Sequence, residues 1–134
     1  MKKTILSAAV AVLIITLFSC SKDNNNSSTP VSNKREVRYE LSGNYSGSLK
    51  FIYSNESFGY NELVVSTFPK SVSITYPSNI SACTANGLTD AVYGKSGETL
   101  TLKIYSGGTL VKTVDATANS VGSIQFPNWG AITF

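Results

Sequence analysis

The chain has 134 residues, room for one domain, and carries 11 Lys and Arg against 8 Asp and Glu, a formal net charge of +3. It contains no histidine, so it lacks the commonest general base and the commonest zinc ligand. Nucleic-acid binding depends on clustered Lys and Arg that neutralise phosphates. Beyond residue 20 the basic residues are scattered except at 34–38 (KREVR), which we interpret as the solvated start of a strand. We therefore expect a protein that is not an enzyme, needs no cofactor or metal and binds no nucleic acid.

The first 19 residues have the pattern of a secretory signal. Lys2 and Lys3 give a positive start, and residues 5–18 form an apolar run without a charge. A helix of that length spans about 21 Å, short of the roughly 30 Å hydrocarbon core of a bilayer. We therefore predict a cleaved signal peptide over residues 1–19 rather than an anchor that spans the membrane.

The sequence Leu17-Phe18-Ser19-Cys20 follows this apolar run and resembles the lipobox of bacterial lipoproteins, with Phe18 where that motif usually has a smaller residue. The resemblance implies cleavage between Ser19 and Cys20, a thioether-linked diacylglycerol on Cys20 and acylation of the new N-terminus. Only a thiolate is nucleophilic enough to take the lipid. Two or three acyl chains anchor a protein stably, where one chain is marginal.

The residues after the cysteine bear on localisation. Ser21 stands where enterobacterial lipoproteins kept at the inner membrane have aspartate. Residues 21–24 (SKDN) also resemble the short Lys-plus-acid signal that sends some Bacteroidota lipoproteins to the cell surface, and a plain solvated linker explains them equally well. The lipoprotein resemblance therefore implies a lipid anchor in the outer membrane, at the periplasmic face or the cell surface.

A flexible linker is predicted over residues 20–33, because residues 23–33 offer one apolar side chain, Val31, to offset the entropy of ordering. The domain is predicted to cover residues 34–134, long enough for one hydrophobic core.

Beyond residue 34 no window keeps an apolar period of 3.6 residues, and short runs rich in Val, Ile, Thr, Tyr and Phe are separated by Gly, Pro, Asn and Ser. This pattern predicts an all-β, antiparallel, immunoglobulin-like sandwich of about seven to nine strands.

Strands are predicted at 36–42, 47–54, 61–67, 70–76, 90–93, 98–106, 109–117 and 121–126, with a further candidate at 131–134. The clearest element is the hairpin over 98–117, because apolar and polar residues alternate from Thr99 to Tyr105 and Ser106-Gly107-Gly108 provides a tight turn. Ser120-Val121-Gly122 predicts the next turn, so the last three long strands should form a meander. Asn86-Gly87 is a candidate for another turn.

Residues 37–43 (VRYELSG) and 48–53 (SLKFIY) are similar to the opening strands of the MmpS-like β-sandwich, V-x-Y-E-V-x-G and a strand ending in I-x-Y. Residues 102–111 (LKIYSGGTLV) match the later hairpin of that family, and Phe68-Pro69 stands where it often has Leu-Pro-Trp. The resemblance spans residues 37–117. It implies an immunoglobulin-like sandwich outside a membrane, in proteins that assist lipid-exporting transporters. Because this chain has a lipobox in place of a transmembrane helix and lacks the Trp, the transporter role does not carry over directly.

Cys83 is the second of two cysteines. With Cys20 lipidated it has no intramolecular partner, and no histidine is present to activate it as a nucleophile. We predict that it is a small buried hydrophobic side chain.

Several aromatic residues fall in predicted loops or strand ends, among them Tyr45, Phe58, Tyr60 and Trp129. Exposed aromatic side chains offer large, rigid contact areas for sugars, peptides or protein partners. The alternative is that these rings fold down and close the ends of the sandwich. Phe58, Tyr60 and Trp129 are the candidates for contact with a ligand or partner, and both interpretations stay open. The sequence thus predicts a lipid-anchored interaction module, accessory to a transporter or another envelope complex, with a surface lipoprotein that captures a carbohydrate or lipid as the alternative.

Overall fold

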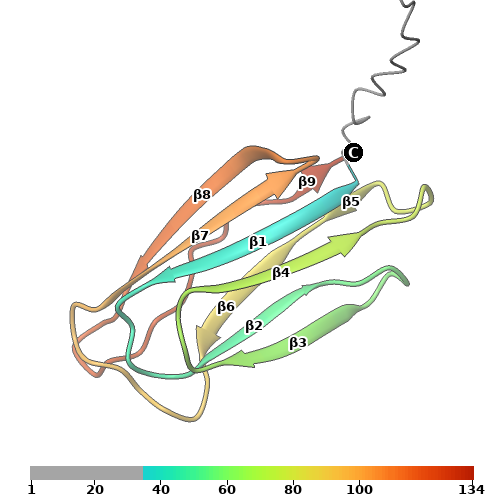
Figure 1. Cartoon of the computed structure of the whole chain (residues 1–134). Coiled ribbons are helices and arrows are strands. Elements are labelled where there is room, and N and C mark those ends of the chain that lie inside the picture. Colours follow the sequence, from blue (N-terminus) through green and yellow to red (C-terminus); the bar gives the residue numbers. More distant parts are fainter. Residues whose placement is uncertain (1–34) are drawn as a thin grey trace, which may run out of the picture.

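The structure, a computed structural model, describes residues 35–134, and this part of the chain holds nine strands (Figure 1). Their bounds are β1 (Glu36–Gly43), β2 (Leu49–Ser54), β3 (Tyr60–Val65), β4 (Lys70–Thr75), β5 (Ala82–Cys83), β6 (Ala85–Thr89), β7 (Thr99–Ser106), β8 (Thr109–Thr117) and β9 (Ile132–Thr133). No helix within residues 35–134 is long and apolar enough to cross a membrane. The predicted signal peptide and linker, with Ser19 and Cys20, lie outside the described residues.

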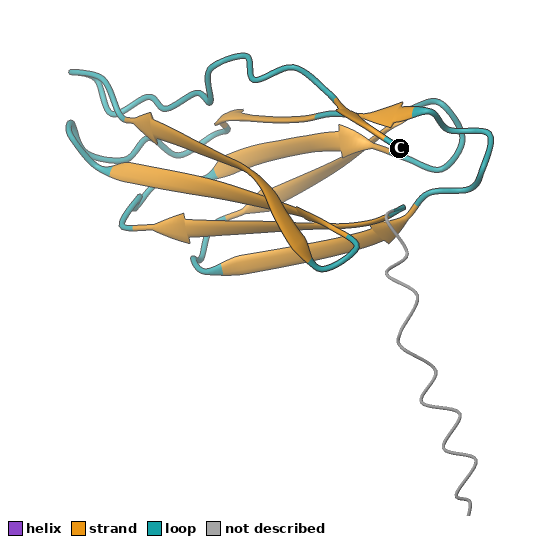
Figure 2. Ribbon diagram, turned by 90° about the horizontal axis from the view of Figure 1, so that it is seen from above, coloured by secondary structure: helices purple, strands orange, loops and turns teal. Residues whose placement is uncertain are grey.

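The strands form two main sheets in which all neighbours are antiparallel. One sheet has the order β4-β1-β7-β8, the other has the order β3-β2-β6, and β5 pairs with β9 in a small third sheet. Loops gather at the two ends of the elongated molecule (Figure 2). The predicted all-β antiparallel sandwich is confirmed. The two main sheets have four and three strands, and the late hairpin β7–β8 lies beside β1.

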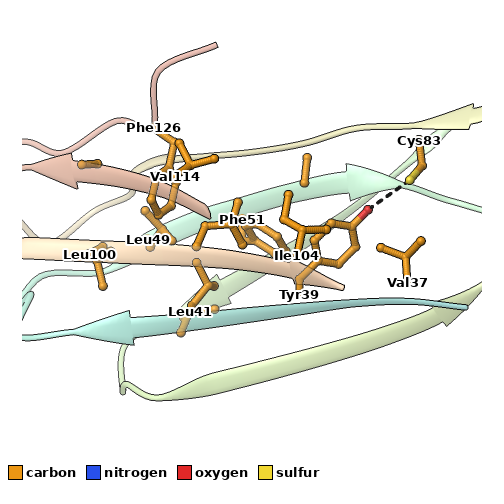
Figure 3. Close-up of a cluster of buried hydrophobic side chains, with 14 of the residues drawn as sticks. Val37, Tyr39, Leu41, Leu49, Phe51, Cys83, Leu100, Ile104, Val114 and Phe126 are labelled. Atoms are coloured by element: carbon orange, nitrogen blue, oxygen red, sulfur yellow. Dashed lines mark hydrogen bonds between the residues drawn. The ribbon is translucent and has the colours of Figure 1, made fainter. Parts of the chain in front are cut away.

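The hydrophobic core lies between the two sheets and follows from alternation along the strands (Figure 3). On β1 the side chains of Val37, Tyr39 and Leu41 are fully buried, whereas Arg38 and Glu40 between them are partly exposed. Successive side chains of a strand point to opposite faces, so this pattern puts one apolar face inward. The ring of Tyr39 meets that of Phe51 on β2 edge-on, with centroids 5.5 Å apart, and so joins the two sheets.

The predicted hairpin is present as β7 and β8. Ser106 pairs with Thr109, and the two glycines between them have φ of 56° and 80°. A two-residue hairpin turn of the commonest type needs positive φ at both central positions, which glycine adopts without steric cost. The sequence Ser106-Gly107-Gly108-Thr109 therefore sets the register next to the turn, and the register shifts at an irregularity between Ile104 and Tyr105.

Two predictions near residue 87 are wrong: Asn86-Gly87 is not a turn and 90–93 is not a strand. Strand β6 occupies Ala85–Thr89 and pairs with β2. A Cβ at Gly87 would lie 2.9 Å from Cδ2 of Phe126, so the glycine makes room for a ring instead of bending the chain. Residues 90–93 form a loop, fastened where Ser48 Oγ accepts the N–H of Val92 at 2.9 Å.

The prediction that 121–126 forms the third strand of a meander after β8 is also wrong. The turn before it exists, because Gly122 has φ 80° and its N–H donates to the carbonyl of Asn119 at 2.9 Å. The chain then runs along β6, not β8: the N–H of Thr89 donates to the carbonyl of Ile124 and the N–H of Phe126 to that of Gly87. Ile124 and Phe126 are buried, so the segment crosses to the other sheet to place these side chains in the core.

Candidate functional site

The outer faces of both main sheets carry charged and apolar side chains. On the four-stranded sheet Arg38 pairs with Glu40 and its guanidinium lies over the ring of Tyr105, 3.9 Å from the centroid, beside the exposed Leu110. On the three-stranded sheet, Val64 and Leu88 are exposed and flank Lys50 in register, and Lys50 pairs with Glu62 at 3.0 Å. Exposed apolar side chains gathered on one sheet face are typical of a binding surface.

Two of the predicted residues, Tyr60 and Trp129, line the same hollow. This hollow, of about 230 Å³, lies where the outer face of β2 and β6 meets the C-terminal segment. It is lined by Ile52, Tyr60, Thr84, Ala85, Asn86, Pro127, Asn128 and Trp129. Tyr60 is the first residue of β3, whereas Trp129 lies close to the C-terminus in the sequence. The fold therefore brings together two residues that are far apart along the chain.

The third predicted residue, Phe58, lines a neighbouring hollow of about 190 Å³ that shares Tyr60 with the first. Its lining is Ser54, Asn55, Phe58, Gly59, Tyr60, Ile80, Ser81 and Ala82. We call the two hollows together the Tyr60 groove. Phe58 and Trp129 therefore line the two separate hollows that both border Tyr60.

The loop between β2 and β3 holds Phe58 outward. The Asn55 side-chain oxygen accepts the N–H groups of Ser57 and Gly59 at 2.9 and 2.8 Å, and the N–H of Asn55 donates back to the carbonyl of Gly59. Within this turn Phe58 has φ 62° and is 76 % exposed. The left-handed conformation costs a non-glycine residue about 1–2 kcal/mol. Such strain gathers at functional sites, and here it displays an aromatic ring to solvent.

Trp129 is partly buried in the C-terminal segment. Its ring packs against the core, and next to it the Gly130 carbonyl accepts the hydroxyl of Thr84 at 3.1 Å. The indole Nε1–H is buried and has no hydrogen-bond acceptor among residues 35–134. An unpaired buried donor costs about 1–3 kcal/mol, so Trp129 occupies this position at an energetic cost.

Among residues 35–134, no charged side chain lines the Tyr60 groove. Neither lining contains Asp, Glu, Lys or Arg, and the polar groups present are the amides of Asn55, Asn86 and Asn128 and several hydroxyls. The groove therefore combines aromatic faces with uncharged hydrogen-bonding groups, a surface suited to a neutral ligand.

Two other residues considered from the sequence have structural roles. Tyr45 is buried, shares a 2.8 Å hydrogen bond with the Thr89 hydroxyl and donates to the carbonyl of Gly122, so it closes the opposite end of the sandwich. Cys83 is buried as predicted, and the Tyr39 hydroxyl donates to its sulfur at 3.7 Å (Figure 3). Burial raises the pKa of the Cys83 thiol, which lowers its reactivity.

Sequence reasoning missed the groove's polar residues. The sequence predicts a turn at Asn86, and Thr84 and Asn128 carry no distinguishing signal, because their positions depend on how distant segments pair. A larger hollow of about 370 Å³ lies by β1 and β4, and Glu40, Lys70 and Lys103 are among its lining residues. None of the predicted aromatic residues contributes to it.

Comparison of the chain with protein families, with curated proteins and with solved structures finds no match. The resemblances to lipoproteins and to the MmpS-like sandwich therefore stay predictions from the sequence.

Proposed function

We propose that this chain is a lipid-anchored protein of the bacterial envelope whose β-sandwich binds a ligand or partner at the Tyr60 groove. The observation that carries the binding role is the convergence of Tyr60 and Trp129 on one hollow. Tyrosine and tryptophan are the side chains most enriched among residues that dominate binding energy. The lipobox-like Leu17-Cys20 segment supports the anchor.

The groove would lie at the end of the domain nearest its anchor. Arg35 donates to the carbonyls of Pro77 and Ile80 at 2.7 and 2.6 Å, and its guanidinium lies 5.2 Å from the centroid of the Phe134 ring. Ile80 also lines the groove, so the first described residue and the groove share one end of the sandwich (Figure 1). Residues 20–33 extend at most about 50 Å, which limits the ligands within reach to those near the membrane.

Binding, not catalysis, is the chemistry that the groove supports. It has aromatic rings, amides and hydroxyls but no carboxylate to act as a general acid or base. A protein partner is a second candidate, favoured by the exposed Val64 and Leu88 on the same sheet face. In that case the protein is an accessory subunit of a transporter or another envelope complex.

Intact mass of the detergent-extracted protein tests the anchor. We expect the mass of residues 20–134 plus two or three acyl chains, and loss of the acyl mass in Cys20→Ala. Cys83→Ala is the matched control, since it removes the chain's other thiol and should keep the lipid. A cleaved chain without lipid, or an uncleaved chain, would show that Cys20 is not the attachment point.

A further inference from the structure

From the lining of the Tyr60 groove we infer that its ligand is a neutral oligosaccharide, held across two adjacent subsites with Tyr60 as their shared wall. This inference rests on the proposed function only in taking the groove as the binding site. It does not depend on the lipid anchor.

The aromatic residues supply surfaces for stacking. A sugar ring presents a flat apolar face of C–H groups and a rim of hydroxyls, so it packs on an aromatic face while its edge hydrogen-bonds. Phe58 and Tyr60 are 76 % and 67 % exposed, and their rings therefore contribute little to the core. Each hollow has at least one such ring in its lining, and Tyr60 contributes to both.

The three asparagine amides are oriented as donors. In each, the side-chain oxygen accepts a backbone N–H: Asn55 from Ser57 and Gly59, Asn86 from Gly87 at 2.7 Å, and Asn128 from Gly130 at 3.1 Å. An amide whose oxygen is engaged in this way directs its NH₂ group elsewhere. Amide donors suit the hydroxyl and ring oxygens of a sugar. An anionic ligand would gain little, because no cationic side chain lines the groove.

The size of the hollows favours an oligomer. Their volumes of about 190 and 230 Å³ are each below the roughly 300 Å³ at which sites for drug-sized molecules begin. Each hollow therefore accommodates a unit of about one ring. Because both are lined by Tyr60, a ligand that fills them has two linked rings on either side of this residue.

The fluorescence of Trp129 provides a direct assay, because it is the only tryptophan in the chain. The chain from residue 20 with Cys20→Ser is titrated with neutral oligosaccharides derived from cellulose, laminarin, starch and mannan, and with their monosaccharides. We expect at least one oligosaccharide to shift the emission saturably and to bind at least about tenfold more tightly than its monosaccharide, a difference of about 1.4 kcal/mol.

Two variants locate the binding. Tyr60→Ala and Asn86→Ala should each weaken it, with the tyrosine change costing about tenfold or more. Both residues are exposed, so neither substitution removes a core side chain, and circular dichroism checks the fold. Tyr93→Ala is the matched control: Tyr93 is 58 % exposed in the loop between β6 and β7, at the other end of the sandwich, and its loss should leave the titration unchanged.

Several results would overturn the inference. One is no saturable response to any of these oligosaccharides, and another is a response that Tyr60→Ala leaves intact. A response only to acidic oligosaccharides such as polygalacturonate would exclude a neutral ligand, and one only to phosphatidylethanolamine vesicles would assign the groove to a membrane surface. Since the mass of the extracted protein is measured separately, failure of the lipid anchor and failure of the glycan site are distinguishable.

Discussion

The buried cluster of Tyr39, Tyr76 and Cys83 should make the sandwich unstable at alkaline pH. Tyr39 is fully buried, and its hydroxyl lies 3.4 Å from that of Tyr76 and 3.7 Å from the sulfur of Cys83. Burial raises the pKa of the Tyr39 phenol well above the ordinary value of 10.0. It raises the pKa of the Tyr76 phenol and of the Cys83 thiol for the same reason.

The sign and size of the effect follow from proton linkage. When a phenol has a higher pKa in the folded protein, the unfolded chain loses its proton first as the pH rises. Its contribution to stability is therefore complete below the unfolded pKa and declines above it, by about 1.4 kcal/mol per pH unit. Tyr39 alone should thus remove about 1.4 kcal/mol from the free energy of unfolding by about pH 11.

Urea unfolding of Tyr39→Phe, followed by circular dichroism under reducing conditions, measures this contribution in the chain from residue 20 with Cys20→Ser. At about pH 8 the variant should lie within about 1 kcal/mol of wild type, because the two contacts of the lost hydroxyl are long. At about pH 11 the variant should gain about 1.4 kcal/mol relative to wild type. Val37→Ala, on the same buried face of β1, is the control and should cost about 2 kcal/mol at both pH values. A pH-independent difference between Tyr39→Phe and wild type would refute the reasoning.

Four further predictions each concern a single position. Tyr76→Phe should cost about 1–3 kcal/mol in urea unfolding, because the Tyr76 hydroxyl donates at 2.7 Å to a main-chain carbonyl at the end of β2. This cost should exceed that of Tyr39→Phe, and equal costs would contradict the reasoning. Gly97→Ala should cost about 1–2 kcal/mol for its φ of 82°. Gly122→Ala, with φ 80°, should lower the melting temperature much further, because its Cβ would lie 2.0 Å from a backbone oxygen, whereas a Cβ at 97 meets nothing within 4 Å. Backbone N–H donors, chiefly that of Lys95, lower the pKa of Glu98 in the folded protein. The ionised Glu98 carboxylate therefore stabilises the fold above about pH 4.5, and this stabilisation is lost as the pH falls through the folded pKa. Glu98→Gln should therefore lose less stability on acidification than wild type, and parallel acid unfolding curves would count against this role.

The fold class could be predicted because its signals are local. Alternation along β1 and β7 specifies which face is buried, and the glycines at 107 and 108 specify a hairpin turn. These signals depend on the strand itself or on adjacent residues. They predict the elements and the fold class. They do not predict the order β4-β1-β7-β8, in which β1 has β4 on one side and the hairpin β7–β8 on the other.

The sequence indicated individual residues of the candidate site but not how they come together. Aromatic side chains in loops pointed to Phe58, Tyr60 and Trp129, and all three line the Tyr60 groove. Nothing local distinguished them from Tyr45, which the fold buries. The difference between a ring that closes the core and one that faces outward is set by tertiary packing, and for Phe58 also by the turn that Asn55 holds.

Two of the errors in the fold, at Asn86-Gly87 and at 121–126, and the missed geometry of the site have one cause. The local sequence predicts a turn at Gly87, but its place in a strand depends on a distant residue, Phe126. The N–H of Phe126 donates to the Gly87 carbonyl, and its ring occupies the space that a Cβ would fill. That contact takes the C-terminal segment away from β8 and lays it along β6. Residues 127–129 follow directly, so the same contact brings Trp129 to the edge of the three-stranded sheet, where it shares a hollow with Tyr60. The glycine that misled the strand assignment is thus the residue that allows the two halves of the groove to meet.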